Sequence, residues 1–328
     1  MRFGIRFIAR AWLFSLAVCS VALALPSAAR AQDYPSKPIK IIVPNPPGGG
    51  NDFVGRLVAE RFREKWKQSV IVENRAGASG SIGAEAVARS APDGYTLLVT
   101  PPASLVINKS FYAKLAYDPD AFVPVSVIVA GPGVLLLNPQ VAAESLPQLI
   151  AFGKANPGKL TYASQGNGTI AHLAGELFQS MGGVKSVHVP YKGSGPAMAG
   201  LLGGQVNMMF GELAPALPHI RAGKLRVLAV GSEKRNPMLP DTPTMSEMLP
   251  GFAFSYWIAM VAPAGTPSAI ANKLSAAIAE LKQPEAAKRL LDTSLDAIGN
   301  TPAEMALFLR QESERWGNVI RVTGMKAQ

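Results

Sequence analysis

Apolar and polar positions along the chain follow two repeating patterns from residue 39 onward. Short runs such as IKIIVP (39–44) and SVIVEN (69–74) are apolar and rich in β-branched residues, which predicts buried strands. The segment 51–66 instead has apolar residues every three or four positions, as on one face of a helix. Asn51 or Asp52 is the expected N-cap of that helix. Strand and helix patterns then alternate through the rest of the chain.

The same two patterns predict the remaining elements. Further strands are expected in the segments 92–100, 122–129, 133–139, 160–164, 186–192, 206–211, 225–231 and 256–263. Further helices are expected at 81–90, 144–158, 170–182, 195–204, 267–282, 284–292 and 302–323. Apolar strands joined by helices predict an α/β protein with doubly wound, mostly parallel sheets that helices cover on both faces.

The alternation falls into two blocks, which predicts two lobes. Gly131-Pro132-Gly133 separates the strands 122–129 and 133–139, and such residues commonly mark a turn or a boundary. We assign the first lobe to 34–131 plus 253–328 and the second lobe to 132–252. The chain then crosses between the lobes twice, which predicts a hinge.

The first 31 residues form a predicted signal peptide. MRFGIRFIAR carries three arginines, and an apolar run of 15 residues, AWLFSLAVCSVALAL, follows it. Small residues at 29 and 31 provide a cleavage site after Ala31. The apolar run is too short for a membrane anchor, which needs about 20 residues. A lipoprotein at Cys19 would cut the run in half. We therefore expect export to the periplasm, with residues 1–31 cleaved.

Removing this segment changes the charge and the cysteine count. The segment holds four arginines and no acidic residue, so the net charge falls from +10 to +6, and the chain's single cysteine is lost. The full chain has 48% hydrophobic residues, enough to build a core without disulfides. The basic residues are scattered and only 7% of residues are aromatic, which does not favour nucleic-acid binding.

Four glycine-bearing segments follow predicted strands and precede predicted helices: PNPPGGGND (44–52), SQGNGT (164–169), YKGSG (191–195) and FGEL (210–213). Glycines and helix N-termini leave backbone N–H groups without partners, and these bind carboxylate or phosphate oxygens. One such segment alone is more typical of an ordinary turn. Their occurrence at strand ends in both lobes predicts an anion site in an interlobe cleft.

Other chemistries find less support. GNGTIA (166–171) fits a dinucleotide-binding pattern, but Lys192 stands where that pattern needs an acid. The histidines, His172, His188 and His219, lack metal-ligand spacing, and no G-x-S-x-G nucleophile motif occurs. We therefore expect no cofactor and no metal site.

Two carboxylates leave an enzymatic alternative open. Asp52 and Glu212 would form an acid/base pair if they met across the cleft, although Asp52 is better explained as a helix cap and Glu212 as a loop residue. A carboxylate at this place would also hold an ammonium or hydroxyl group of a ligand. Whether His172, Tyr256 or Trp257 line the pocket stays open at this point.

Together these motifs resemble one family. The chain is similar, over about 36–324, to the Bug proteins, the periplasmic solute-binding receptors of tripartite tricarboxylate transporters. The resemblance rests on PNPPGGGND, VENRAGASGSIGAEAVARSAPDGYTLL, NPGKLTYASQGNGTIAHLAGELF, VHVPYKGSGPAMAGLLGGQVNMMF, LPHIRAGKLRVLAV and VAPAGTP, in the same order. It implies a two-lobe periplasmic-binding-protein fold of the Venus-flytrap type II class, which closes on a carboxylate held by backbone amides and waters.

The family's ligand contacts carry over to matching positions in both lobes. In the first lobe they fall on Asn45, Pro46, Gly49, Gly50, Asn51 and Asp52, together with Ala103 and Ser104, where the family often has a threonine-containing turn. In the second lobe they fall on Ser164, Gly168, Thr169, Lys192, Gly193, Ser194 and Glu212. Two positions depart from the family, since Asn45 replaces a commonly aromatic or apolar residue and Glu212 stands where Asp is frequent. Both departures bear on which solute is bound.

The sequence therefore predicts a monomeric periplasmic receptor rather than an enzyme. It would bind one small carboxylate between the lobes and deliver it to the membrane subunits of a tripartite tricarboxylate-type permease. A receptor that presents its solute to a signalling partner would share these features, and an exported enzyme using Asp52 and Glu212 is the less favoured alternative.

Overall fold

The computed structural model describes residues 34–291 and 294–326. The predicted signal peptide, 1–31, lies outside the described residues. The chain divides into a short N-terminal unit, 1–36, and one large unit, 37–328. In the described part of the chain, no helix has the length and apolar character needed to cross a bilayer.

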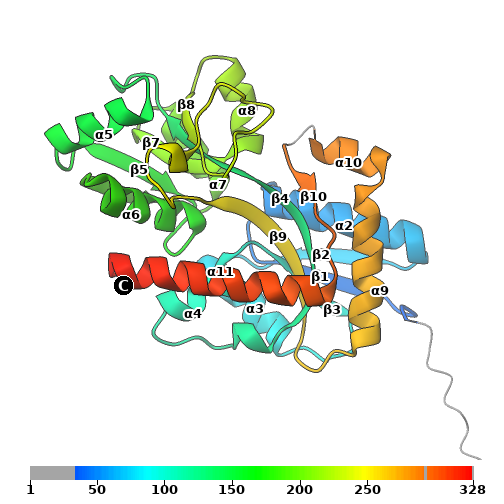
Figure 1. The fold of residues 1–328 in the computed structure, drawn as a ribbon. Coiled ribbons are helices and arrows are strands. Elements are labelled where there is room, and N and C mark those ends of the chain that lie inside the picture. Colours follow the sequence, from blue (N-terminus) through cyan, green and yellow to red (C-terminus); the bar gives the residue numbers. More distant parts are fainter. Residues whose placement is uncertain (1–33, 292–293, 327–328) are drawn as a thin grey trace, which may run out of the picture. The chain divides into compact units, whose positions relative to one another are not determined.

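The chain first builds a βαβαβ arrangement (Figure 1). Its elements are β1 (Ile39–Val43), α2 (Gly50–Trp66), β2 (Val70–Asn74), α3 (Ser81–Ala88) and β3 (Thr96–Thr100). A π-helical turn (Ala103–Ile107) leads into α4 (Asn108–Phe111), and the long strand β4 (Val123–Leu137) follows. The strands expected at 39–44 and 69–74 and the helix expected at 51–66 are confirmed.

A second alternating series continues from the end of β4. It comprises α5 (Leu146–Ala155), β5 (Leu160–Ser164), α6 (Ile170–Gly182), β6 (Ser186–Pro190), α7 (Ser194–Leu202), β7 (Met208–Glu212), α8 (Leu213–Arg221) and β8 (Arg226–Val230). The chain then returns through β9 (Ser255–Ala262) to α9 (Ser268–Ala279), α10 (Pro284–Leu291), β10 (Asp296–Ala297) and α11 (Pro302–Thr323). Helix α8 occupies a segment for which the sequence pattern had predicted no element.

Among the described residues the strands form one ten-stranded sheet with the order β2-β1-β3-β9-β4-β7-β5-β6, and β8 and β10 also pair with β4. The outer strands are parallel: β1 pairs in parallel with β2 and β3, and β5 with β6 and β7. The central strands β4 and β9 run antiparallel to their neighbours. The α/β class is confirmed, but the sheet is mixed. The reason is that β4 and β9 carry the chain across the sheet in opposite directions.

Strand β4 corrects one expectation from the sequence. The segment Gly131-Pro132-Gly133 does not break it, because β4 is continuous from Val123 to Leu137. Instead, the strand changes partners there. Residues 123–132 pair with β9, whereas residues 133–137 pair with β7. A proline lacks an N–H donor, and it is tolerated where the ladder changes. We call β2, β1, β3, β9, β10 and residues 123–132 of β4 the first half of the sheet, and β5, β6, β7, β8 and residues 133–137 of β4 the second half.

Side chains from both halves form a shared core. One buried cluster joins Leu98 of β3, Leu135 of β4, Tyr162 of β5 and Phe210 of β7. Helix α11 contacts β4, α9 and α6 and so reaches both halves (Figure 1).

Buried Glu312 anchors α11 to the sheet. Its Oε2 accepts hydrogen bonds from the indole N–H groups of Trp257 and Trp316, at 3.0 and 3.1 Å. Trp257 is therefore a core residue of β9, which answers one question that the sequence left open.

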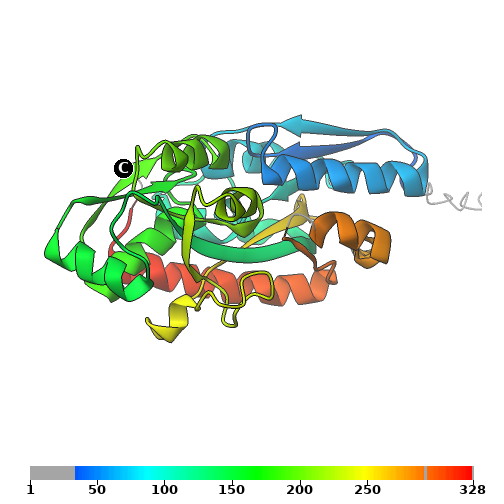
Figure 2. The ribbon, with the colours of Figure 1, turned by 90° about the horizontal axis from the view of Figure 1, so that it is seen from above.

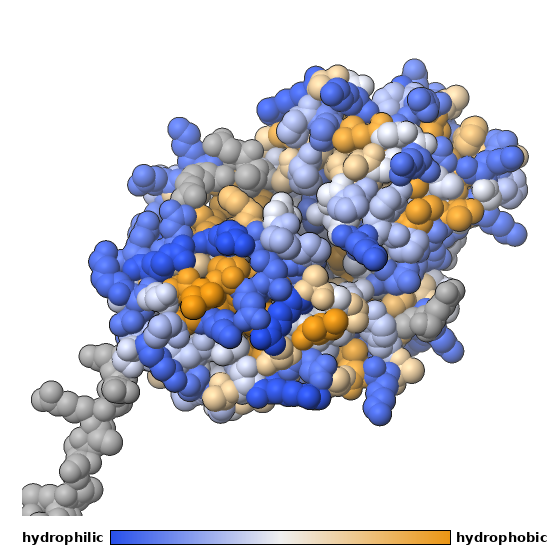
Figure 3. All heavy atoms as spheres, turned by 180° about the vertical axis from the view of Figure 1, so that it is seen from behind, coloured by the Kyte–Doolittle hydropathy of each residue, from blue (hydrophilic) through white to orange (hydrophobic). Residues whose placement is uncertain are grey.

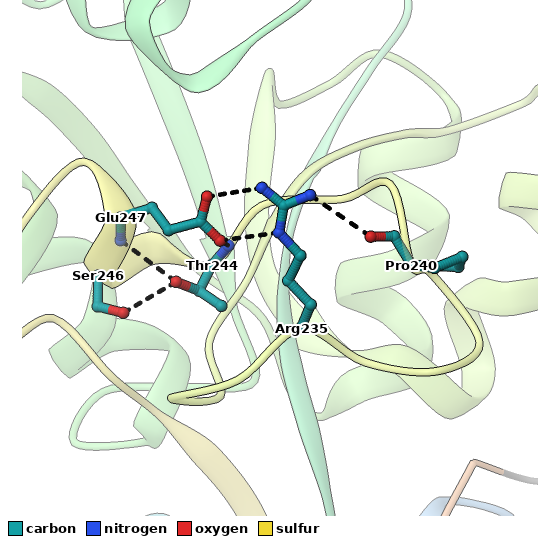
Figure 4. A network of polar contacts seen from close by, with 5 residues as sticks. All are labelled: Arg235, Pro240, Thr244, Ser246 and Glu247. Atoms are coloured by element: carbon teal, nitrogen blue, oxygen red, sulfur yellow. Dashed lines mark hydrogen bonds and ion pairs between the residues drawn. The ribbon is translucent and has the colours of Figure 1, made fainter.

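The connection from β8 to β9 is held by its own polar network (Figure 4). The guanidinium of Arg235 donates to both carboxylate oxygens of Glu247, at 3.0 and 2.7 Å. The hydroxyl of Thr244 accepts a hydrogen bond from the Glu247 amide, and the Glu247 side chain accepts one from the Thr244 amide, a capping box. These contacts order the segment that leads the chain back into β9.

Candidate ligand-binding site

The N-terminus of α2 presents free amides at the carboxyl end of β1. The structure corrects the predicted cap: Gly49 is the N-cap, with an extended backbone (φ −87°, ψ 171°), and Asn51 and Asp52 lie in the first turn. In the described part of the chain, the amides of Gly50, Asn51 and Asp52 donate to no protein acceptor. This is the arrangement in which a helix start binds an anion.

Asp52 holds the glycine loop in place. Its Oδ2 accepts hydrogen bonds from the Gly48 amide (3.0 Å) and the Arg56 Nε (2.9 Å), and its Oδ1 accepts one from Asn74 (3.0 Å). Burial by itself would raise the pKa of this carboxyl group, but the hydrogen bonds from Arg56, Gly48 and Asn74 keep the pKa below its ordinary value. Both oxygens are occupied, so the side chain organises the loop and its charge is already compensated.

The amide of Asn51 connects the ends of two neighbouring strands. Its Nδ2 donates to Asn45 Oδ1 (2.7 Å) and to the carbonyl of Val99 (3.3 Å). Its Oδ1 is buried and has no partner within the described residues. Asn45, the predicted specificity residue, is therefore fixed by Asn51 and lies partly exposed beside it.

Ala103 and Ser104 lie beneath the loop rather than at its surface. Both are buried. The Ser104 hydroxyl is paired with that of Thr100, at 2.6 Å. Because that hydroxyl is already satisfied, Ser104 supports the loop through packing, including against Gly80.

In the second half, the loop 164–169 is held by two stacked histidines. His188 Nε2 pairs with the buried Ser164 hydroxyl at 2.7 Å, and the Gly168 amide donates to His172 Nδ1 at 3.1 Å. The two imidazole rings stack with their centroids 3.9 Å apart. Thr169 is the N-cap of α6, but its hydroxyl donates to the Gly166 carbonyl instead of capping the helix.

Both imidazoles are kept neutral. Burial lowers the pKa of His172 to about 4, and burial together with the neighbouring His172 lowers the pKa of His188 to about 3. Neutral rings stack without charge repulsion, and the acceptor nitrogen of His172 stays available to the Gly168 amide. The histidines therefore support the loop from beneath.

The N-terminus of α7 faces that of α2 (Figure 2). Gly193 is the N-cap of α7 at φ +110°, a value that favours glycine. A Cβ atom placed on Gly49 would lie 3.9 Å from the Ser194 hydroxyl, and one placed on Gly193 would lie 4.0 Å from Pro46. Two helix starts from opposite halves of the sheet therefore meet at loops without bulky side chains. Lys192 next to them is exposed.

The carboxylate of Glu212 lies at the same junction. Glu212 ends β7 and is the N-cap residue of α8, although its side chain caps nothing. A Cβ atom on Gly50 would lie 3.8 Å from Glu212 Oε2. The residue keeps a small exposed area, yet protein atoms surround its carboxyl group, and this burial raises its pKa to about 7.

Tyr256 and Gln165 complete the junction. The Tyr256 hydroxyl donates to the carbonyl of Phe210 at 2.7 Å, and Gln165 Nε2 donates to the Tyr256 oxygen at 3.4 Å. Burial and the nearby charge of Glu212 raise the pKa of Tyr256. The sequence left Tyr256 undecided and did not single out Gln165. The position of Gln165 directly after the carboxyl end of β5 was the available signal.

The structure thus divides the predicted residues into two groups. Those brought together at the junction are Pro46, Gly49, Gly50, Asn51, Gly193, Ser194 and Glu212. The others act from behind it or stand apart from it, and these are Asn45, Asp52, Ala103, Ser104, Ser164, Gly168, Thr169 and Lys192.

A further contact between the halves was not anticipated. Phe111 of α4 lies edge-on to His172, with ring centroids 6.0 Å apart, and fits against Gly168, where a Cβ atom would lie 2.8 Å from its ring. The Ser79 hydroxyl also donates to the carbonyl of Asn167. No sequence period reveals this packing, because the partners are far apart in the chain.

Comparison with known proteins agrees with this architecture. Residues 54–325 match the tripartite tricarboxylate transporter family receptor, TctC. Protein BugT of Bordetella pertussis is 41% identical over 300 residues, 90% of this chain and 92% of BugT.

Two solved structures share the fold. R. palustris Rpa4515 with adipate has a TM-score of 0.85 and 34% identity, covering 90% of this chain and 99% of that one. The periplasmic binding protein BugD has a TM-score of 0.82 and 33% identity, covering 90% of this chain and all of that one. The predicted periplasmic-binding-protein fold is confirmed, and the chain belongs to the tripartite tricarboxylate transporter receptor family, which includes the Bug proteins.

Proposed function

We propose that the protein is a periplasmic receptor that binds one small carboxylate and delivers it to a tripartite tricarboxylate-type permease. The observation that carries this proposal is the meeting of the α2 and α7 N-termini at loops of small residues, Gly49 and Gly50 on one side and Gly193 and Ser194 on the other. The relative Rpa4515 was solved with adipate, a dicarboxylate, which supports the ligand class.

The electrostatics of the junction favour an anion. A helix N-terminus carries a partial positive charge, and an anion there gains about 0.3–1 kcal/mol per helix. The first-turn amides of α2, which have no acceptor within the described residues, would add hydrogen bonds to the ligand. Micromolar affinity requires about 8 kcal/mol, so several such amides must act together. Amides from two opposing helix starts meet this need without an arginine.

Closing of two lobes around the ligand is the proposed mode of action. The partner change of β4 at residues 132 and 133 supports the lobe boundaries 34–131 plus 253–328 and 132–252. Within the described residues, β4 is the strand that pairs with both halves of the sheet, and the chain returns to the first half at β9. A ligand that contacts both halves stabilises the closed arrangement and shifts the population toward it.

The arrangement of carboxylates does not favour catalysis. Asp52 is fully engaged by Arg56, Gly48 and Asn74, and its lowered pKa suits neither a general base nor a general acid near neutral pH. Glu212 then has no partner for acid/base chemistry. We infer that the protein binds its solute without converting it.

A thermal-shift panel tests the function. The panel contains mono-, di- and tricarboxylates of increasing chain length, with neutral sugars and amines as controls. At a concentration one hundred times Kd, a true ligand stabilises the protein by about 2.7 kcal/mol. We expect stabilisation by one group of related acids and none by the controls. Absence of a shift with every acid would refute the carboxylate proposal.

A further inference from the structure

The junction contains unpartnered hydrogen-bond acceptors that a bare carboxylate does not satisfy. The Glu212 carboxylate makes no hydrogen bond or ion pair with any described residue, although it is surrounded by protein. The Gln165 Oε1 atom is buried and has no partner among the described residues. A buried acceptor left unpaired costs about 1–3 kcal/mol, so the site favours a ligand that supplies donors.

The hydrogen bonds of Tyr256 and Gln165 explain why the unpaired atoms at the junction are acceptors. A backbone carbonyl only accepts, so the Tyr256 hydroxyl must give its single proton to Phe210. The Tyr256 oxygen therefore acts as the acceptor toward Gln165. The Gln165 atom that faces it must be the donor Nε2, so Oε1 is the atom without a partner among the described residues. Tyr256 has no donor left for Glu212, and Gln165 makes no hydrogen bond to Glu212 within the described residues.

The place of Glu212 strengthens the argument. Its Oε2 lies 3.8 Å from a Cβ position on Gly50, beside the amides that we propose for the ligand carboxylate. A ligand carboxylate bound at these amides would lie close to Glu212, and two neighbouring carboxylates repel unless a proton or a donor lies between them. Asn51 in the same helical turn adds a third buried acceptor, Oδ1, without a partner.

We propose that Glu212 and Gln165 form an acceptor subsite that selects a carboxylate bearing a hydrogen-bond donor, an ammonium or a hydroxyl group, next to its carboxylate. This inference rests on the proposed function and narrows its ligand class. The helix starts of α2 and α7 hold the ligand carboxylate. Glu212 and Gln165 accept from the donor, which also separates the two negative charges.

Calorimetric titration with matched acids tests the subsite. One series is succinate, malate and aspartate, and the other is adipate, 2-hydroxyadipate and 2-aminoadipate, with both enantiomers of each substituted acid. Within a series only the group at carbon 2 changes. At every chain length that binds, we expect a donor-bearing acid to bind at least tenfold more tightly than the unsubstituted acid.

Variants of Glu212 separate the two donors. Glu212→Gln keeps an acceptor oxygen but removes the charge, so it should reduce a preference for the amino acid by at least tenfold and leave most of a preference for the hydroxy acid. Glu212→Leu removes the acceptor and should abolish both preferences. Glu233→Gln, the same change at an exposed side chain after β8, should leave the ranking unchanged.

Proton release provides an independent readout. An ammonium beside Glu212 stabilises its ionised form, so wild-type protein at pH 7 should release up to about half a proton per amino acid bound, measured by calorimetry in two buffers. The proposal is overturned if unsubstituted acids bind as tightly as substituted ones, or if the donor preference survives Glu212→Leu. If no acid binds at all, the proposed function itself fails.

Discussion

At the scale of single residues, Asp52 shows how a side chain can organise the loop proposed to bind the ligand. The carboxylate reaches back from the first turn of α2 to the Gly48 amide and sideways to Asn74. It thereby joins the loop after β1 to the end of β2. Its negative charge is balanced by Arg56, so the free amides of the helix start remain attractive to an anion.

The variant Asp52→Asn should destabilise the fold. The asparagine side chain is uncharged, so the hydrogen bonds from Arg56 and Gly48 become weaker. We therefore expect the free energy of unfolding at pH 7 to fall by about 1–3 kcal/mol. The native pKa of Asp52 is below its ordinary value of 3.8, so this stabilisation is present above pH 3.8 and is lost as the pH falls below that value. Urea unfolding at pH 7 and pH 3 measures the difference.

Asp241→Asn is the matched control, because Asp241 is exposed. It should change the unfolding free energy little at either pH. A loss for Asp52→Asn that is equally large at pH 3 would contradict the electrostatic explanation and point to a packing effect alone.

At the scale of elements, the start of α2 combines rigidity with open space. Gly49 has ordinary extended angles that any residue can adopt, so its backbone does not require glycine. The requirement is spatial, since Pro46 and the Ser194 hydroxyl each lie 3.9 Å from its Cβ position. The glycine therefore keeps the approach between α2 and α7 free of side chains.

Substitution of Gly49 should separate binding from folding. Gly49→Ala adds one methyl group at ordinary contact distance, and ligand affinity should change by less than about threefold, under 1 kcal/mol. Gly49→Val extends further into the space between the helix starts and should weaken binding at least tenfold, with the unfolding free energy within about 1 kcal/mol of wild type. Calorimetry with the best acid of the panel measures both. Equal affinity of the valine variant would mean that the loop is an ordinary turn.

At the scale of the whole molecule, buried titratable groups in the second half have opposite effects on how the stability of the fold depends on pH. His172 and His188 have pKa values lowered to about 4 and about 3, so the stability that they contribute is present above pH 6.5 and is lost as the pH falls below it. Glu212 has its pKa raised from 4.5 to about 7, so its contribution is present below pH 4.5 and is lost as the pH rises through 7.

The stability of the protein between pH 7 and pH 5 should therefore depend on Glu212. In the wild type, the stability lost at the two histidines as the pH falls is offset in part by the stability gained at Glu212. The variant Glu212→Gln lacks that gain, so its free energy of unfolding should fall more steeply from pH 7 to pH 5. Urea unfolding of both proteins at several pH values checks this. Parallel curves would show that Glu212 does not titrate in this range.

The sequence by itself determined the local elements and the family. Apolar periodicity over 39–43 and 51–66, glycine after strand ends and the ordered motifs suffice for these, because such signals depend on neighbouring residues. The loops at 44–52 and 191–195 were found in the same way. Periodicity also suggested a break at Gly131-Pro132-Gly133, where the folded chain continues as one strand.

The tertiary structure alone decided which polar atoms are already used. Asp52, Ser164 and Ser104 have the residue types of a binding site, yet other side chains already occupy their oxygens. The partners of Asp52 and Ser164 are distant in the chain, whereas that of Ser104 is the nearby Thr100. Within the described residues, the Oε1 atom of Gln165 and the carboxylate of Glu212 have no partner, because Tyr256, which arrives later in the chain with β9, gives its only proton to Phe210. Hydrogen-bond satisfaction depends on contacts between distant segments, so it becomes defined only when the two halves of the sheet meet.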